Sequence, residues 1–164
     1  MPEDEVDRIV AAWRRERPDL DVSPLEVLSR VGRLARHVDR ARRAAFTGHG
    51  LQPWEFDVLA ALRRAGAPYQ LSPGQLVVQT LVTSGTITNR VDRLTGRGLL
   101  ERHPGLTDRR GVLVRLTPSG LQRVDGALAD LVRREHELLA ALDPDERDAL
   151  AAVLRRLVAP FDSG

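Results

Sequence analysis

The chain has 164 residues, of which 42% are hydrophobic and 29% are charged, so it is long enough to bury one well-formed core. The formal net charge is +2, all basic residues are arginine and no cysteine occurs, which excludes disulfide bonds and thiol redox switches. The acidic amino terminus lacks an apolar segment followed by a small-residue cleavage site, and no apolar run approaches membrane-spanning length. We therefore expect a cytoplasmic protein with no membrane partner.

Helix starts are marked along the chain by prolines that each follow a residue able to cap a helix. The five pairs are Ser23-Pro24, Gln52-Pro53, Ser72-Pro73, Thr117-Pro118 and Asp143-Pro144. In the three pairs whose cap is Ser or Asp, a Glu or Gln also stands in the capping-box position, at Glu26, Gln75 and Glu146. Together with apolar periodicity, these signals predict helices near 3–17, 24–46, 53–65, 72–79, 83–97, 118–141 and 144–160 within a single domain over 1–164.

The first predicted helix carries an apolar stripe that ends in a tryptophan. Val6, Ile9, Val10 and Trp13 recur at helical spacing, and Pro18 closes the segment. Taken alone, an aromatic residue in such a stripe is more often a packing residue than a ligand contact.

The second helix and the last two helices carry more apolar residues than a small domain covers by itself. Their apolar positions are Leu25, Leu28, Val31, Leu34, Ala35, Val38, Leu121, Val124, Leu128, Leu131, Leu138, Leu142, Leu150, Val153, Leu154 and Leu157. These residues either pack only within their own domain or also meet a partner.

The segment 83–97 is predicted to be a helix with one face on the core and the other face free. Its apolar stripe is Ile87, Val91 and Leu94, whereas the positions farthest from the stripe are Gly85, Asn89, Asp92, Arg93 and Gly96. Asn and Arg offer paired hydrogen-bonding groups to base edges, and Ser and Thr hydroxyls can hold phosphates. We predict that this helix reads DNA through a set of polar residues, Ser84, Thr86, Thr88, Asn89 and Arg93.

Two apolar runs of strand length follow, Leu99–Arg102 and Val112–Leu116, and the loop between them is rich in polar and turn-forming residues. The pattern predicts a hairpin with a polar tip. Arg109 and Arg110 on this tip are predicted to enter the minor groove of DNA, with Asp108 bracing one of them. An isolated Asp-Arg-Arg run would more often be a solvated turn, but its attachment to the preceding helix favours a contact with DNA.

The run Asp108-x-Arg110, followed after five residues by Leu116-Thr117-x-x-Gly120, resembles the wing motif of the MarR family of winged helix-turn-helix regulators. The preceding segment TSGTITNRVDRL is similar to the recognition helix of that family. The resemblance implies a mainly α fold with a small β-hairpin wing, in which 53–116 binds DNA and the helices 24–46 and 118–160 form a dimerisation region. It also implies a homodimer that reads a pseudo-palindromic operator in double-stranded DNA, and we favour that partner for the apolar faces.

The extra helix at 3–17, with its tryptophan, resembles the urate-responsive branch of the MarR family. That branch is understood to bind a purine-like anion through a Trp on the extra helix, an Asp at the start of a core helix, an Arg in the recognition helix and an Arg at the base of the wing. The matching residues are Trp13 in AAWRRE, Asp57 in WEFDVL, Arg90 in TNRVDRL and Arg102 in LLERH. The resemblance therefore implies a small anionic effector such as urate.

The chemistry of these four residues suits such an anion, because guanidiniums pair with its oxygens, a carboxylate accepts from ring N–H groups and an indole covers one edge. If Asp57 holds Arg90 in the unliganded protein, an anion that takes Arg90 and Arg102 would shift the recognition helix and release a repressor from DNA. The alternative is a buried Asp57–Arg90 ion pair that is purely structural, with another effector such as a phenolic compound or a secondary metabolite.

The signals of an enzyme are missing from the sequence. The four histidines have no metal-ligand spacing, and the chain has neither a glycine-rich phosphate loop nor a serine in a nucleophile elbow. We therefore expect no catalytic residues, no metal site and no cofactor. A winged helix that serves purely as a protein-interaction module is a less favoured alternative, and it predicts little salt-dependent affinity for duplex DNA.

Overall fold

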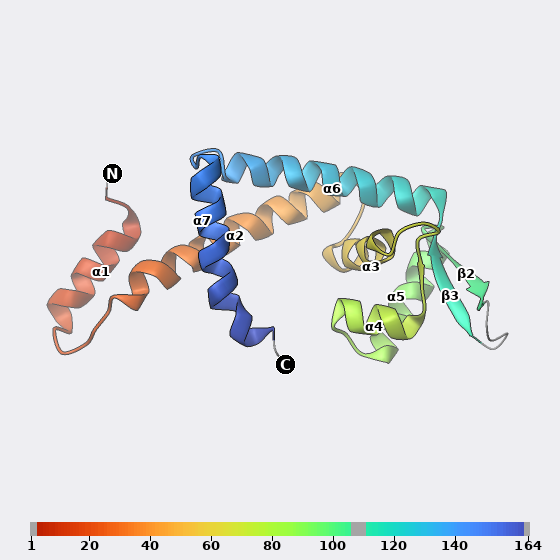
Figure 1. The fold of residues 1–164 in the computed structure, drawn as a ribbon, viewed down its shortest axis with the longest axis horizontal. Helices are drawn as coiled ribbons and strands as arrows, with labels where there is room; N and C mark the ends of the chain where they lie inside the picture. The colour runs from red at the N-terminus through yellow and green to blue at the C-terminus, as the bar shows by residue number, and fades with distance from the viewer. Residues whose placement is uncertain (1–2, 106–110, 163–164) are drawn as a thin grey trace. The chain divides into compact units, whose positions relative to one another are not determined.

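The computed structural model describes residues 3–105 and 111–162, and Figure 1 shows the elements in chain order. The chain divides into two compact units, Met1–Arg42 and Arg43–Gly164. The long helix α2 (Pro24–Gly48) contributes most of its length to the first unit and its last residues to the second.

The first unit consists of α1 (Glu5–Glu16) and the greater part of α2, which share a small core. Val6 and Val10 of α1 are each 1% exposed and pack with Val22 and, less completely, with Leu25. Trp13 lies on the same stripe but keeps 49% of its surface exposed. Trp13 is therefore not one of the buried packing residues of this core.

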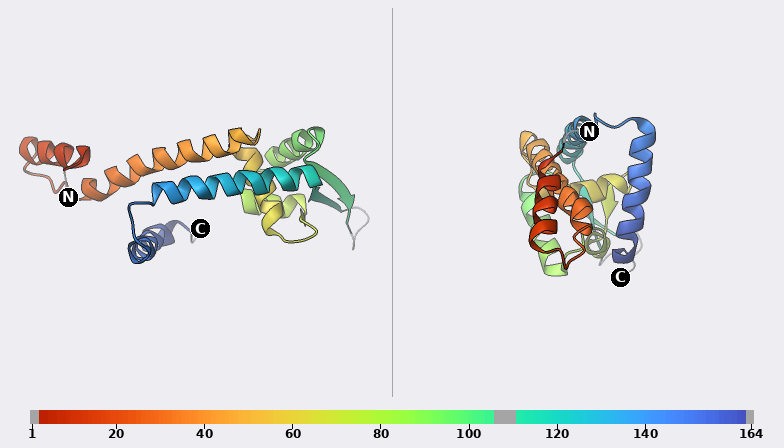
Figure 2. Two further views of the ribbon diagram at one scale, coloured as in Figure 1. Left: turned by 90° about the horizontal axis from the view of Figure 1, so that it is seen from above. Right: turned by 90° about the vertical axis from the view of Figure 1, so that its left-hand side faces the viewer.

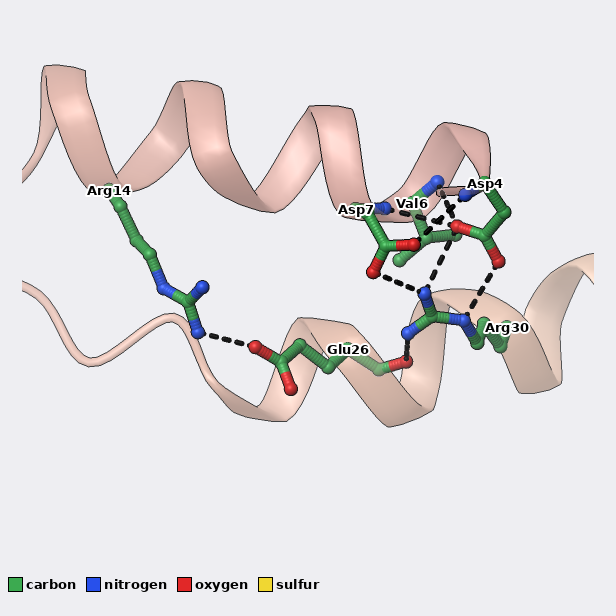
Figure 3. Close-up of polar contacts among 6 residues, drawn as sticks. All are labelled: Asp4, Val6, Asp7, Arg14, Glu26 and Arg30. Carbon is green, nitrogen blue, oxygen red and sulfur yellow. Dashed lines mark hydrogen bonds and ion pairs between the residues drawn. The ribbon is translucent and has the colours of Figure 1, made fainter. Parts of the chain in front are cut away.

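Ion pairs attach α1 to the start of α2, as Figure 3 shows. Arg30 donates from Nε and Nη2 to the two carboxylate oxygens of Asp4, at 2.9 and 3.0 Å, and from Nη2 to Asp7 at 2.6 Å. Arg14 forms a second ion pair, with Glu26. One guanidinium thus holds two carboxylates of the first turn of α1 and its cap.

The carboxylate of Asp4 is stabilised in its charged form by this arrangement. The hydrogen bond from Arg30 is the main cause, and it holds the pKa of Asp4 at about 2 rather than the usual 3.8. A carboxyl group with a lowered pKa stabilises the folded state above its unfolded pKa and loses that contribution as the pH falls through its folded pKa. The attachment of α1 is therefore complete near neutral pH and weakens between pH 3.8 and about 2.

Replacing Arg30 with alanine is expected to loosen α1. The change removes every hydrogen bond that Arg30 makes to Asp4 and Asp7, so the amides of 5–16 should exchange hydrogen a few-fold faster while those of α5 stay unchanged. Arg15→Ala is the matched control, because Arg15 pairs with the adjacent Glu16 at 2.9 Å and not across the two helices. Equal exchange rates in α1 of both variants would contradict this role of Arg30.

The second unit contains a helical core with a three-stranded antiparallel sheet beside it. Its first elements are α3 (Pro53–Arg64), β1 (Gln70–Leu71), α4 (Pro73–Thr80), α5 (Ser84–Gly96), β2 (Leu100–Pro104) and β3 (Val112–Leu116). The strand order is β1-β3-β2, with Gln70 opposite Arg115 and Leu100 opposite Leu116. The β2–β3 hairpin extends beyond the neighbouring helices of its unit (Figure 2). The predicted hairpin is confirmed, whereas β1 is a strand that the sequence pattern does not predict.

The unit ends in α6 (Pro118–Leu138), α7 (Pro144–Val158) and the short helix η1 (Ala159–Phe161). All five prolines that mark predicted helix starts are the first residues of helices, at Pro24, Pro53, Pro73, Pro118 and Pro144. The capping boxes at Ser72 with Gln75 and Asp143 with Glu146 are also formed. The predicted helices are confirmed to within three residues at each end.

The core of the second unit lies around α3, which is buried along most of its length. Phe46 at the end of α2 stacks on Phe56 of α3 with ring centroids 4.1 Å apart. Val124 and Leu131 of α6 are 1% and 5% exposed and belong to the same core. Of the two possibilities for the apolar positions of α6, these two residues therefore follow the first, because they pack inside their own chain.

The junction between the wing and α6 explains the residues of the Leu116-Thr117-x-x-Gly120 run. The Thr117 hydroxyl accepts from the N–H of Gly120 at 3.0 Å and donates to the carbonyl of Gly98 at 2.7 Å. A Cβ atom on Gly120 would lie only 2.1 Å from the carbonyl oxygen of Leu99. Thr117 is thus the helix cap, and Gly120 allows the backbone of α6 to approach that of the residue before β2.

Part of the apolar surface of the last two helices is not covered within the second unit. None of the residues of α7, all of which are described, is buried. The large apolar side chains of these helices that remain exposed are Leu128, Val132, Leu138, Val153, Leu157 and Val158. Within residues 3–105 and 111–162, no helix is both long enough and apolar enough to cross a membrane.

Candidate functional site

The helix α5 has one face in the core and one face on the surface. Ile87, Val91 and Leu94 are at most 2% exposed. Of the residues predicted to contact DNA, Thr86 is half-buried and the others on this helix are exposed, namely Ser84, Thr88, Asn89 and Arg93. The predicted orientation of α5 is confirmed, and the contacts of these residues with DNA remain predictions.

Local hydrogen bonds fix both ends of α5. The Thr83 hydroxyl accepts from the N–H of Thr86 at 3.3 Å, which caps the first turn. At the other end Gly98 has a φ of 69°, and the N–H of Leu99 reaches the carbonyl of Leu94 at 3.0 Å. Glycine adopts this left-handed conformation without strain, so the helix ends here and the chain turns into β2.

A surface depression of about 430 Å³ lies on the exposed side of α5 and is lined by Trp54, Gly85, Thr86, Asn89, Arg90 and Arg93. The guanidinium carbons of Arg90 and Arg93 lie 5.4 and 5.0 Å from the centroid of the Trp54 ring. Arg90 therefore lies beside the predicted DNA-contacting residues. The sequence patterns do not identify Trp54 as a site residue. The residues around a tryptophan at a helix start do not show that two arginines of another helix lie over its ring.

The four predicted ligand residues come from both units of the chain. Trp13 is on α1 in the first unit, and the other three are on α3, α5 and β2 in the second. Arg102 donates from Nη2 to Asp92 Oδ1 at 2.5 Å, so its partner in the structure is a carboxylate of α5. A shared pocket for the four residues stays a prediction.

Asp57 is exposed on the surface of α3, which contradicts the alternative of a buried Asp57–Arg90 ion pair. The buried carboxylate of α3 is Glu55, which is 3% exposed. Its Oε1 accepts from Arg97, the residue that follows α5, at 2.5 Å, and its Oε2 accepts from the N–H of Gln52 at 2.8 Å. Because a buried charge needs a partner, Glu55 ties the end of α5 to the start of α3. Its position three residues after Gln52 is the sequence signal that identifies it.

The two strands of the wing remain paired as far as Gly105 and Gly111, on either side of the tip. Pro104 is opposite Val112, and the N–H of Gly105 donates to the carbonyl of Gly111 at 2.8 Å. Asp108, Arg109 and Arg110 lie outside the described residues, so their contacts with DNA and the brace by Asp108 stay predictions. In the part of the chain that the structure describes, no group of three or more His, Asp or Glu side chains is arranged to hold a metal ion.

Comparisons with known proteins agree with this architecture. Residues 49–111 match the model of the MarR family. The chain is 40% identical to the HTH-type transcriptional regulator PecS of Dickeya dadantii, over 93% of this chain and 92% of PecS. It is 34% identical to the HTH-type transcriptional repressor NicR of Pseudomonas putida, over 85% of this chain and 89% of NicR.

A solved structure gives the same result for the fold. BpsR of Bordetella bronchiseptica, described for the regulation of its DNA binding by 6-hydroxynicotinic acid, is 31% identical with a TM-score of 0.58, over 78% of this chain and 98% of BpsR. The relatives of this chain are transcriptional regulators rather than enzymes. With its exposed α5, its hairpin wing and a relative that matches nearly the whole chain, the protein belongs to the MarR family of HTH-type transcriptional regulators.

Proposed function

We propose that this chain is a homodimeric repressor that binds duplex DNA through α5 and is released by a small anion such as urate. The observation that carries the proposal is the division of α5 into a buried apolar stripe and an exposed face with Asn89 and Arg93. Paired hydrogen-bonding groups on an exposed helix suit the base edges of a major groove. Arg109 and Arg110 of the wing would add contacts in the adjacent minor groove.

A second copy of the chain is the partner proposed for the exposed apolar surface of α7. Val153, Leu157 and Val158 are 50%, 48% and 47% exposed. Contact with a second apolar surface would remove these side chains from water, which favours association of the two chains. A symmetric pair of chains would present two α5 helices to the two half-sites of a pseudo-palindromic operator.

The ion pair between Arg102 and Asp92 offers a route by which an anion could act on α5. Arg102 is on β2 and Asp92 is on α5, and their side chains are 42% and 57% exposed. An anion that binds the Arg102 guanidinium would compete with Asp92 and remove this link between wing and helix. If the effector favours the detached arrangement, it weakens DNA binding by the same factor by which DNA weakens effector binding.

The alternative candidate is a regulator of the same kind that responds to a different ligand. BpsR is described as regulated by 6-hydroxynicotinic acid, which is also a planar anion. In this alternative, Asp57 and Arg90 have only structural roles, and a phenolic compound or a secondary metabolite replaces urate. Titration of the DNA complex with both urate and 6-hydroxynicotinic acid separates the two candidates.

Replacing Arg102 with alanine is expected to weaken DNA binding, because it removes the same link to Asp92 that the anion would break, and to raise the urate concentration needed for half release of the complex that still forms. A hydrogen bond between charged groups contributes about 1.5–3 kcal/mol, so the increase should be about 10- to 150-fold. The measurement is fluorescence anisotropy of a labelled duplex titrated with urate at fixed salt. Arg115→Ala is the matched control, because Arg115 lies on the neighbouring strand and donates to Gln70 at 2.8 Å. Unchanged urate sensitivity in Arg102→Ala would remove Arg102 from the effector site.

A further inference from the structure

Two arginines of α5 share one aromatic ring that belongs to α3. Arg90 and Arg93 are three residues apart, so their side chains leave the helix on neighbouring sides, and both guanidiniums lie over Trp54 at 5.4 and 5.0 Å. Trp54 follows Pro53 in the first turn of α3 and packs partly against the core of the second unit. The ring is therefore anchored independently of α5.

The indole is the group that fixes these two cations. Like charges at this spacing on a helix repel each other, whereas the face of an indole attracts a guanidinium within about 6 Å. A guanidinium that lies over a ring keeps its N–H donors at its edge, where they are free for an acceptor.

The surroundings of the ring suit an anionic oxygen. Gly85, Thr86 and Asn89 line the same depression as the two arginines. Thr86 adds a hydroxyl and Asn89 an amide, while Gly85 contributes no side chain that would obstruct an approaching backbone. The depression therefore combines two fixed cations with neutral polar groups on the exposed side of α5.

The geometry points to Trp54 as a positioning residue for DNA: its ring holds Arg90 and Arg93 so that their guanidiniums bind phosphates of one DNA strand when α5 enters the major groove. This inference rests on the proposed function, since it assumes that α5 binds duplex DNA. Trp54 acts through the two arginines and need not touch DNA. A phenyl ring offers a similar face to a guanidinium, whereas a methyl group does not.

The test compares Trp54→Ala and Trp54→Phe in full-length protein by anisotropy of a labelled duplex over a series of salt concentrations. Trp54→Ala is expected to bind about 5- to 30-fold more weakly, because two cation–π contacts are lost. Its plot of log affinity against log salt should also be shallower by about one to two units, because phosphate contacts set that slope. Trp54→Phe should bind within about threefold of the wild type with the wild-type slope.

The slope separates positioning from a purely structural effect, because partial unfolding lowers the apparent affinity equally at every salt concentration and leaves the slope unchanged. Tyr69→Ala is the matched control: it removes a ring that carries Arg63 at 4.9 Å, outside the depression on α5. Two results would overturn the inference while the proposed function stands. One is a plot of log affinity against log salt for Trp54→Ala with the wild-type slope. The other is a loss of DNA affinity in Trp54→Phe as large as that in Trp54→Ala. Failure of the wild-type protein to bind duplex DNA in a salt-dependent way would instead overturn both.

Discussion

Gly120→Ala is expected to lower the melting temperature of the protein by roughly 6–12 °C. The added Cβ would lie 2.1 Å from the carbonyl oxygen of Leu99 and 3.3 Å from Cδ2 of Leu116. The first of these atoms belongs to the backbone, so relief requires α6 to move away from the start of the wing. Overpacking typically costs about 1–3 kcal/mol, and a clash with a backbone atom belongs at the upper end of that range, at about 3 kcal/mol. Each kcal/mol shifts the melting temperature of a chain of this size by roughly 2–4 °C.

Gly96→Ala is the control for the effect of adding a methyl group. A Cβ on Gly96 meets no atom within 4 Å, and this residue ends α5 in the same unit. Thermal unfolding followed by circular dichroism should give Gly96→Ala a melting temperature close to that of the wild type. If Gly120→Ala had the same melting temperature as Gly96→Ala, the close approach of α6 to the wing would not be needed for the fold.

Asn89→Ala is expected to weaken binding to the preferred operator by about 5- to 150-fold. Asn89 is exposed on α5, and a side-chain amide that makes two hydrogen bonds to adenine is worth about 1–3 kcal/mol of discrimination against other bases. The same change should reduce the difference in affinity between the preferred operator and a variant with one A·T pair replaced. Competition binding with the two unlabelled duplexes measures both effects.

Gln122→Ala provides the matched control, because it removes an exposed amide from α6 rather than from α5. We expect it to bind both duplexes as the wild type does. Equal losses for the preferred and the altered duplex in Asn89→Ala would mean that Asn89 contacts the backbone rather than a base. No loss at all would remove Asn89 from the DNA interface.

Sequence patterns predict most of the fold here because helix starts are local features. A proline after a capping residue fixes the first turn without help from distant residues, and all five such pairs begin a helix. β1 behaves differently, since Gln70 and Leu71 become a strand only by pairing with Arg115 and Val114 of β3. A two-residue strand has too few positions for an alternating pattern.

The site is less predictable because it depends on which side chains meet across elements. Helical periodicity correctly separates the buried Ile87 from the exposed Asn89, since both lie on one helix. The partners of Arg102 and Arg90 are Asp92 and Trp54, and these pairs form only once β2 and α3 are placed against α5. No spacing within one element reveals such a pair.

The choice between two acidic residues of α3 illustrates the same limit. The resemblance to urate-responsive regulators draws attention to Asp57, which is exposed, so the alternative of a buried Asp57–Arg90 ion pair is contradicted. Glu55, two residues earlier, is the buried carboxylate and pairs with Arg97. Two positions differ by roughly 200° around a helix, so the residues face nearly opposite directions. The capping position of Glu55 predicts its location, but its pairing with Arg97 requires the packed structure.

The most direct measurement is fluorescence anisotropy of a labelled duplex from the intergenic region upstream of the protein's own gene, titrated with protein over a series of salt concentrations and then with urate. If α5 and the wing bind DNA as proposed, log affinity falls steeply and linearly with log salt, and urate releases the duplex at fixed salt. Salt-dependent binding that neither urate nor 6-hydroxynicotinic acid reverses would contradict the proposed effector chemistry. Affinity that is absent, or that does not change with salt, would contradict the central claim that this chain is a DNA-binding regulator.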